Sequence, residues 1–283
     1  MTDGRKASTT RVRATVVTAD GARRKADVLA TEEPLEIRVE DAATGEAIFN
    51  HVTMRTPGAD FELTAGLLLA EGVIQRADQL RQMEFCVGPK WTAVQQYNIV
   101  SALVTGSDPE RRAGAHFRTA VSACGVCGKA SLDDISLRGI EPLPDGPGVD
   151  RDLVTRLPEL LRSKQALFDR TGGLHGAALV SGDGRVLAVR EDVGRHNAVD
   201  KVIGWALLNP GEAGDAVALM VSGRLSFELA QKAVVGRVPV LAGVSAPSSL
   251  AVEVADEFNL TLIGFLRGDS FNIYAHPERV SGI

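Results

Sequence analysis

Cysteine is scarce in this chain. The 283 residues include only three, at positions 86, 124 and 127. An odd number of cysteines in a chain of this length does not suit a disulfide-stapled secreted fold. The N-terminus has no apolar core of the kind that secretory signals carry. We therefore expect a protein of the reducing cytoplasm.

The chain also lacks a basic surplus and any stretch that could span a membrane. Its formal net charge is −5, whereas nucleic-acid-binding domains usually carry an excess of lysine and arginine. No apolar run approaches the roughly 18 residues that a membrane helix needs. Hydrophobic residues make up 45% and charged residues 24%, which is typical of a soluble protein with a real core. We expect neither a nucleic-acid partner nor a membrane partner.

Two of the three cysteines lie three positions apart. Cys124 and Cys127 are each followed by a glycine, Gly125 and Gly128, and Lys129 comes next. The glycines permit an open backbone. A nearby cation favours the thiolate, which is the form in which cysteine reacts. These residues predict a loop that presents sulfur.

Such a cysteine pair has three interpretations: half of a zinc site, a thioredoxin-type redox pair, or a sulfur carrier in which one cysteine holds a persulfide. Zinc would need two more ligands, but the sequence has no second C-x-x-C and no H-x-x-x-H. A thioredoxin-like pair would open a helix inside a βαβ unit, whereas this pair follows a polar segment. The spacing favours reactive sulfur over metal and leaves the alternatives open.

The pattern divides the chain into residues 1–118, 119–150 and 151–283. The first part predicts a small α+β domain with a basic tail, part of it mobile, and Cys86 is expected in its core. Its expected strands are 12–16, 35–40, 48–55 and 91–104, with a helix that starts after Thr56-Pro57-Gly58 and runs through Leu63 to Ala70. The second part contains the cysteine loop and a linker, 141–148, rich in proline and glycine.

The third part alternates strands and helices, which indicates an α/β domain with a mixed, partly parallel sheet. Expected strands cover 174–180, 185–191, 216–221, 238–244, 261–266 and 271–274. Expected helices cover 153–168, 198–206, 227–235 and 249–258. The predicted fold class is therefore α/β, with a small α+β domain in front of it.

Polar residues follow three of these strands, in 191–197, 222–226 and 245–249. Ligands of open α/β sheets settle at the carboxyl ends of strands, where helix N-termini supply spare N–H groups. Each turn alone could be an ordinary helix cap, but three on one edge favour an anionic ligand such as a nucleotide. His175 and His196 could bind a metal or carry a proton, although each alone suits an ordinary hydrogen-bonding role.

Four segments together resemble the formate dehydrogenase accessory sulfurtransferases, the FdhD family. They are the cysteine loop 124–128, the segment TPGADFEL at 56–63, the segment EDVGRHNAVDK at 191–201, and Ser222-Gly223-Arg224. The resemblance extends, in the same order, from about Leu35 to the C-terminus. It implies a C-terminal domain similar to the cytidine deaminase fold without its zinc chemistry, and it implies a homodimer.

The resemblance further implies a sulfur carrier. The protein would accept sulfane sulfur from a cysteine desulfurase and pass it to the molybdenum cofactor, as bis(molybdopterin guanine dinucleotide), before insertion into formate dehydrogenase. Cys124 is the expected persulfide site and Cys127 the resolving thiol. The expected contacts to this cargo are Phe265, Leu266, Arg267, Gly268, Asp269 and Ser270, with Ser222, Gly223, Arg224 and His196. No resident metal or permanent cofactor is expected.

Two functions of other classes stay open. A non-catalytic zinc- or nucleotide-binding chaperone would deliver the cofactor without handling sulfur. A disulfide oxidoreductase would use the same two cysteines to reduce disulfides.

Overall fold

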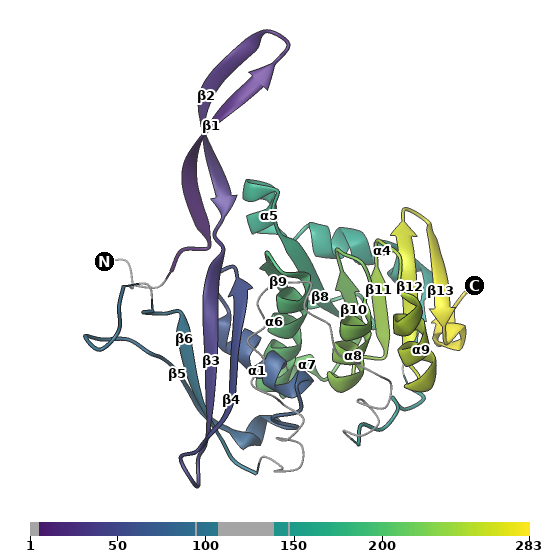
Figure 1. Cartoon of the computed structure of the whole chain (residues 1–283). Coiled ribbons are helices and arrows are strands. Elements are labelled where there is room, and N and C mark those ends of the chain that lie inside the picture. The colour runs from purple at the N-terminus through teal and green to yellow at the C-terminus, as the bar shows by residue number, and fades with distance from the viewer. Residues whose placement is uncertain (1–5, 94, 107–138, 147) are drawn as a thin grey trace.

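The computed structural model describes residues 6–93, 95–106, 139–146 and 148–283. The expected sulfur-presenting loop, with Cys124 and Cys127, lies outside these residues. The described chain forms a projecting hairpin, a four-stranded sheet and a six-stranded sheet, with helices packed around and between the two larger sheets (Figure 1). None of the described helices is both long and apolar enough to cross a membrane.

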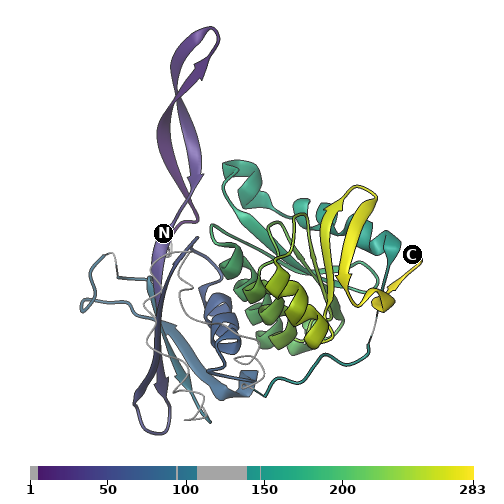
Figure 2. The same cartoon turned by 45° about the vertical axis from the view of Figure 1, so that its right-hand side comes forward.

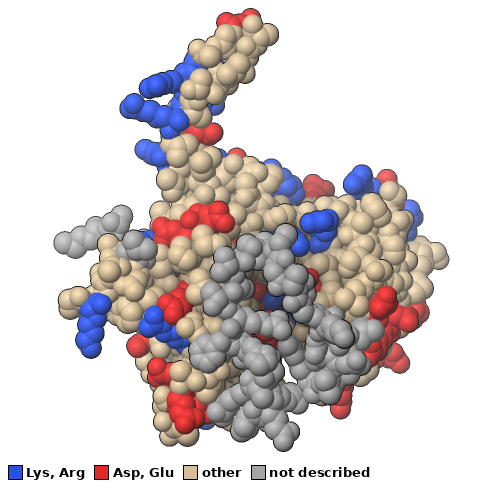
Figure 3. Space-filling model, in the orientation of Figure 1, with Lys and Arg blue, Asp and Glu red and all other residues tan. Residues whose placement is uncertain are grey.

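The hairpin consists of β1 (Thr9–Thr18) and β2 (Gly21–Ala30) and stands away from the rest of the molecule in both views (Figures 1 and 2). Directly paired residues share a face of such a ribbon, so the register places Arg11, Arg13 and Arg24 on one face. Figure 3 shows Lys and Arg along this arm. The expected strand over 12–16 is confirmed within β1, and the structure adds a second strand, β2, with which it is paired from Thr9 to Ala30.

The smaller sheet has the strand order β4-β3-β6-β5. Its elements are β3 (Glu33–Asp41), β4 (Ala47–Arg55), helix α1 (Asp60–Ala70), the 3-10 turn η1 (Ala77–Gln79), β5 (Leu80–Phe85) and β6 (Ile99–Val104). β3 and β4 form the antiparallel hairpin that their alternation predicts. Leu35, Ile37 and Val39 are buried on the inner face of β3 and share one core with α1.

The expected strand over 91–104 is wrong in its first half. Trp91 lies in a turn, where its N–H donates to the carbonyl of Gly88 at 3.1 Å, and pairing begins only at Ile99. β5 was not expected from the sequence because a register shift between Leu80 and Gln82 breaks its alternation. Cys86, expected in the core, follows β5 and is half-buried.

The larger sheet has the order β13-β12-β11-β10-β8-β9. Its strands are β8 (His175–Ser181), β9 (Val186–Asp192), β10 (Ala216–Val221), β11 (Val240–Gly243), β12 (Thr261–Arg267) and β13 (Ser270–Ala275). β10, β11 and β12 run parallel, and the remaining pairs are antiparallel. The predicted α/β class with a mixed sheet is therefore confirmed. A small sheet of β7 (Val149–Asp150) and β14 (Val280–Ser281), with the 3-10 turn η2 (Pro277–Arg279), lies beside it.

Helices cover both faces of this sheet (Figures 1 and 2). They are α4 (Arg151–Arg162), α5 (Ala166–Thr171), α6 (Arg195–Leu208), α7 (Pro210–Ala213), α8 (Phe227–Val235) and α9 (Ser249–Glu257). Successive strand residues point to opposite faces: Ala218 and Met220 pack with α4, whereas Leu219 and Val221 pack with α6, α8 and α9. Burial on both faces explains why these strands read as continuous apolar runs.

The expected helix over 153–168 is two helices, α4 and α5. The backbone leaves the helical region at Gln165, with φ −83° and ψ 66°. The second helix starts because Glu191, from the neighbouring β9, accepts hydrogen bonds from the N–H groups of Leu167 and Phe168, at 2.9 and 2.6 Å. This cap comes from a residue distant in sequence, so local patterns could not reveal it.

The two sheets are joined by helices α1 and α6, which cross at two glycines. A Cβ atom on Gly66 would lie 1.9 Å from the carbonyl oxygen of Asp200, and one on Gly204 would lie 1.8 Å from that of Glu62. Only glycine allows such close backbone approach. One hydrophobic core therefore runs from the smaller sheet through both helices into the larger sheet.

The proline- and glycine-rich segment is fastened to the C-terminal part of the molecule. Leu143 is buried, and its N–H donates to the carbonyl of Phe258 at 2.9 Å. Arg279 donates to the carbonyl of Pro144 at 2.8 Å. The domain boundaries expected from the sequence, 1–118, 119–150 and 151–283, stay a prediction.

Candidate functional site

Three turns meet at the carboxyl edge of the parallel strands. The N–H of Leu225, after β10, donates to the carbonyl of Ala246, after β11, at 3.1 Å. The N–H of Phe265, in β12, donates to the carbonyl of Ser245 at 3.2 Å. The expectation that strand ends 222–226 and 245–249 would lie together at one edge is thus confirmed. Their role in binding a cofactor stays a prediction.

The first of these turns lies against His175 and Arg195. The Ser222 hydroxyl accepts a hydrogen bond from the N–H of Gly176 at 2.9 Å, which ties the turn to β8. A Cβ on Gly223 would lie 3.5 Å from both His175 Nδ1 and Arg195 Cδ. A Cβ there would be in ordinary van der Waals contact, so the turn passes close between the His175 imidazole and the aliphatic part of Arg195.

The charge state of the His175 imidazole, next to Gly223 and Arg195, follows from its burial. Desolvation, and after it the positive charge of Arg195, lowers the pKa of His175, so the imidazole is neutral at neutral pH. The Nε of Arg195 is buried and has no hydrogen-bond partner among the described residues. His175 was a candidate metal ligand or proton carrier from the sequence, and Arg195 lies in the polar strand end 191–197, but neither was predicted as a cofactor contact. The sequence could not place either side chain against Gly223.

His196 points to another pair of side chains. Its Nε2 lies 3.3 Å from the Ser226 hydroxyl and 3.6 Å from the Glu228 carboxylate. The hydrogen bond with His196 lowers the pKa of Glu228 to about 2. His196 is thus paired with the start of α8 rather than with the Ser222-Gly223 turn, and its expected cofactor contact stays a prediction.

The predicted cofactor segment 265–270 forms the end of β12 and its turn into β13. Phe265 has a left-handed backbone, φ 51°, and is 40% exposed. The guanidinium of Arg267 lies 6.0 Å from the centre of the Phe265 ring. Gly268 has φ 54°, and Asp269 and Ser270 are exposed, as is Arg224 in the turn after β10. An exposed aromatic ring with a guanidinium beside it suits a flat or anionic ligand.

Leu266 behaves differently from its neighbours. Its side chain is 1% exposed and packs in the core on the α4 face of the sheet. It holds the segment in place, and only its backbone is available to a ligand.

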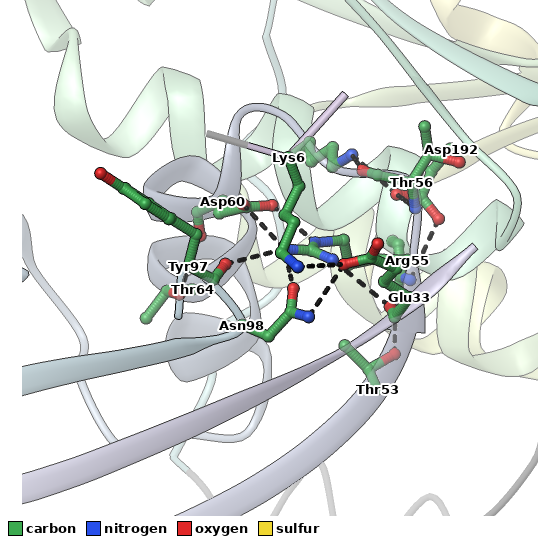
Figure 4. Close-up of polar contacts among 12 residues, drawn as sticks. Lys6, Glu33, Thr53, Arg55, Thr56, Asp60, Thr64, Tyr97, Asn98 and Asp192 are labelled. Atoms are coloured by element: carbon green, nitrogen blue, oxygen red, sulfur yellow. Dashed lines mark hydrogen bonds and ion pairs between the residues drawn. The ribbon is translucent and has the colours of Figure 1, made fainter. Parts of the chain in front are cut away.

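The two longest segments of the sequence resemblance dock against each other. Lys201, on α6, forms a buried ion pair of 2.7 Å with Asp192 and donates to the carbonyl of Thr56 at 2.8 Å. Asp192 also accepts from the N–H of Thr56 at 3.1 Å, a contact visible in Figure 4. Asn197 donates to the carbonyl of Met54 at 2.7 Å. These residues form the polar joint between the two sheets.

A second buried cluster supports that joint from the smaller sheet. Figure 4 shows Arg55 surrounded by Asp60 and Asn98. Its Nε donates to Asp60 at 3.0 Å, its Nη2 donates to Asn98 at 3.1 Å, and its side chain is fully buried. A buried charge is tolerated when it is paired and hydrogen-bonded in this way. The Arg55 cluster orders the chain next to Thr56, and the Asp192–Lys201 pair ties the 191–201 segment to it.

Metal coordination finds no support in the described part of the chain, where no three His, Cys, Asp or Glu side chains gather. The cysteines that carry the sulfur expectation, Cys124 and Cys127, lie outside it.

The fold and the edge turns define an α/β protein in which a mixed six-stranded sheet is joined to a smaller four-stranded sheet through helices α1 and α6. Residues 30–281 match the family model described as the FdhD/NarQ family. The chain therefore belongs to the FdhD/NarQ family.

Individual relatives agree with this assignment. The chain is 49% identical over 275 residues to the sulfur carrier protein FdhD of Mycolicibacterium paratuberculosis, covering 96% of this chain and 98% of the relative. It is 47% identical over 262 residues to the sulfur carrier protein FdhD of Anaeromyxobacter dehalogenans, covering 90% and 88%. A crystal structure from Desulfotalea psychrophila, of a candidate formate dehydrogenase accessory protein, is similar with a TM-score of 0.71, 23% identity and coverage of 96% and 99%. That last likeness confirms the fold.

Proposed function

We propose that this protein is a sulfur carrier that serves formate dehydrogenase. Membership of the FdhD/NarQ family, together with relatives named sulfur carrier proteins at 49% identity, is the observation that carries the proposal. The pair Cys124 and Cys127, between glycines, supplies the chemistry. The donor is a cysteine desulfurase, and the recipient is the molybdenum cofactor in its bis(molybdopterin guanine dinucleotide) form.

Loading is a thiol-exchange step. The Cys124 thiolate attacks the terminal sulfur of the desulfurase persulfide, a new S–S bond forms on Cys124, and the desulfurase cysteine leaves as a thiolate. No net oxidation occurs, because the sulfane sulfur only changes its carrier. The reducing cytoplasm would keep the accepting thiol available.

Release requires two electrons. The Cys127 thiolate attacks the Cys124 sulfur, a disulfide forms between them, and the outer sulfur leaves as hydrosulfide for the cofactor. The two thiols are oxidised as the sulfane sulfur is reduced. A cellular dithiol reductant then restores the pair for the next cycle.

The sheet edge is the proposed docking place of the cargo. Phe265, Arg267 and Gly268 form an exposed turn at the end of β12, on the same sheet edge as the Ser222-Gly223-Arg224 turn after β10, with the turn after β11 between them. Arg195 brings a guanidinium whose Nε has no partner among the described residues. These groups suit the phosphates and flat rings of a nucleotide-bearing cofactor. We further propose that the protein acts as a homodimer and meets apo-formate dehydrogenase after loading.

Mass spectrometry tests the sulfur step. The wild-type protein, incubated with a cysteine desulfurase and L-cysteine, should gain one sulfur on Cys124. Cys124→Ala should lose this load, whereas Cys86→Ala, at a half-buried cysteine remote in sequence from the loop, should keep it. Cys127→Ala should load normally and fail to release hydrosulfide. Full loading of Cys124→Ala contradicts the assignment.

The same variants distinguish a sulfur carrier from a non-catalytic zinc chaperone. Stoichiometric zinc in purified wild-type protein, lost together in Cys124→Ala and Cys127→Ala, would favour that function over sulfur transfer. In cells lacking the protein, formate dehydrogenase should accumulate with a sulfur-deficient cofactor.

A further inference from the structure

The β1–β2 hairpin has no core of its own. Neither strand contains a buried residue, and two of its large apolar side chains, Val17 and Leu29, are 75% and 45% exposed. A single two-stranded hairpin is at best marginally stable in water unless it packs against another element. At its base, Arg170 on α5 donates to the Thr9 hydroxyl at 3.4 Å, and beyond that point the hairpin stands away from its own chain (Figures 1 and 2). A second molecule can supply the packing that the hairpin lacks.

Charge is divided between the hairpin and the body of the protein, residues 31–283. The hairpin contains five basic and two acidic residues, a charge of +3. The body contains 24 Lys and Arg against 33 Asp and Glu, a charge of −9. Opposite potentials on two surfaces steer them together and fix how they meet. The hairpin of one copy is therefore complementary in charge to the body of another copy.

One face of the hairpin combines this charge with apolar surface. The register places Arg11, Arg13 and Arg24 on that face, with Val17 nearer the tip, and all four side chains are exposed. Arginine is enriched in protein–protein interfaces. A nucleic-acid-binding domain usually has a basic surplus overall, whereas this chain has a net charge of −5. The face thus suits an acidic protein surface better than a nucleic acid.

The hairpin is large enough to hold a dimer together. Each strand has 10 residues. At about 3.3 Å per residue the hairpin is about 33 Å long, and two strands present a face about 10 Å wide. In a two-fold dimer each copy gives one hairpin and receives one. Burial of one face of both hairpins removes about 1,300 Å² from water, counted on both copies, and stable interfaces bury roughly 1,200–2,000 Å².

We infer that the hairpin face with Arg11, Arg13 and Arg24 docks on the acidic body of a second copy of this chain, reciprocally, in a two-fold dimer. The inference deepens the proposed homodimer, on which it rests, by naming the surface that holds the two copies together. The match to the FdhD/NarQ family model begins at residue 30, where the hairpin ends, so that match does not assign this contact.

Carbodiimide cross-linking tests which surfaces touch, because it joins a lysine amine to a carboxylate in contact with it. Arg13→Lys keeps the charge and places an amine on the docking face. Lys25, the one lysine between Thr9 and Ala30, lies on the opposite face and is the internal control. Mixing the protein with its ¹⁵N-labelled form identifies links between copies by mass spectrometry.

The expected links join position 13 of one copy to Asp or Glu within residues 31–283 of the other, and they should exceed the links from Lys25. Links from position 13 to Asp20 or Asp27 of a second hairpin would mean that hairpins contact each other, and they would overturn the inference. Absence of links between copies from position 13 would overturn it as well.

Charge reversal tests the energetics. Replacing Arg11, Arg13 and Arg24 together by Glu changes the hairpin from +3 to −3. Loss of three exposed ion pairs, and their replacement by like-charge contacts, corresponds to a rise of roughly 100-fold in the dimer Kd measured by sedimentation velocity. Added salt should weaken the wild-type dimer and have little effect on the variant.

The matched control makes the same change of charge at three exposed positions on and just after α4: Arg151→Glu, Arg156→Glu and Lys164→Glu. It makes the body more acidic, so its dimer Kd should stay the same or fall. Equal Kd values in the hairpin variant and this control overturn the inference.

The outcomes separate this contact from the rest of the proposed function. A wild-type dimer whose Kd the hairpin variant shares overturns the docking and leaves the homodimer. A wild-type protein that is monomeric at micromolar concentration overturns both. Slow amide exchange over residues 9–30 that appears only after a cysteine desulfurase or an RNA oligonucleotide is added assigns the hairpin to that partner and overturns the inference. Sulfur loading of Cys124 in the hairpin variant reports on the sulfur step by itself.

Discussion

Replacing Gly66 by alanine should separate the two sheets at their closest contact. The added Cβ would lie 1.9 Å from the carbonyl oxygen of Asp200, on the backbone of α6. Comfortable contact needs roughly 3.5 Å, so α1 and α6 would have to move apart by about 1.5 Å. Gly204 lies in the same crossing and also faces backbone atoms, so no side-chain movement can relieve the clash between the two helices.

Two effects of opposite sign decide the outcome. Alanine favours an isolated helix over glycine by about 1 kcal/mol. Overpacking a tight core destabilises by about 1–3 kcal/mol or more, and here the clash is between backbones, which adjust least. A backbone clash belongs at or just above the top of that range, about 3–4 kcal/mol, so we expect Gly66→Ala to lower the free energy of unfolding by about 2–3 kcal/mol net. With an unfolding entropy of roughly 0.6 kcal/mol/K for a chain of this size, Tm should fall by about 3–5 °C.

Far-UV circular dichroism follows the loss of secondary structure, and the fluorescence of Trp205, on α6, follows the loss of packing around this helix. Gly211→Ala is the matched control, since that glycine is also helical and a Cβ there would meet nothing within 4 Å. Its Tm should stay the same or rise slightly. A Gly66→Ala protein as stable as Gly211→Ala would refute the argument that the helices touch through their backbones.

Two other perturbations address buried and half-buried charges. Asp192→Asn leaves the Lys201 ammonium buried without its carboxylate partner at 2.7 Å and should lower the free energy of unfolding, measured in urea, by about 3–5 kcal/mol. Adding Lys201→Met should recover much of this loss. A double variant as unstable as Asp192→Asn would contradict the ion pair. Glu228→Gln tests the hydrogen bond with His196 that lowers the pKa of Glu228 to about 2. A depressed carboxyl pKa stabilises the native state above the ordinary value of 4.5, and this stabilisation is lost as pH falls toward 2. The difference in unfolding free energy between wild type and Glu228→Gln should be about 0.5–1 kcal/mol at pH 5.5 and should shrink progressively toward pH 2. A difference that does not change with pH would contradict the hydrogen bond between Glu228 and His196.

The strands of the larger sheet could be predicted from the sequence because each is a short apolar run between turn residues. Ala216–Val221 has the predicted bounds, and β12 (Thr261–Arg267) extends the predicted strand by one residue. The β3–β4 hairpin was predictable for a different reason, since one face is buried and the other solvated, which produces strict alternation.

The features that local patterns missed depend on contacts between distant residues. α5 starts where Glu191 caps it, and β5 is held by β6 despite a break in its alternation. β2 is mostly exposed and its apolar residues do not alternate with polar ones, so it carries no strand signal. The site followed the same division: turns at strand ends were predictable, but the approach of both His175 and Arg195 to Gly223 depends on the fold.

The projecting hairpin has two open flanks, since neither β1 nor β2 pairs with any other described strand. An unpaired strand flank can recruit a flank from another molecule, which leads to aggregation. Five basic residues against two acidic ones between Thr9 and Ala30 give this arm a charge of +3, so two such arms repel each other at low salt. The arginines and lysine of the hairpin thus oppose its self-association. Concentrated protein should stay clear in dilute buffer and turn cloudy as added salt screens the repulsion between hairpins.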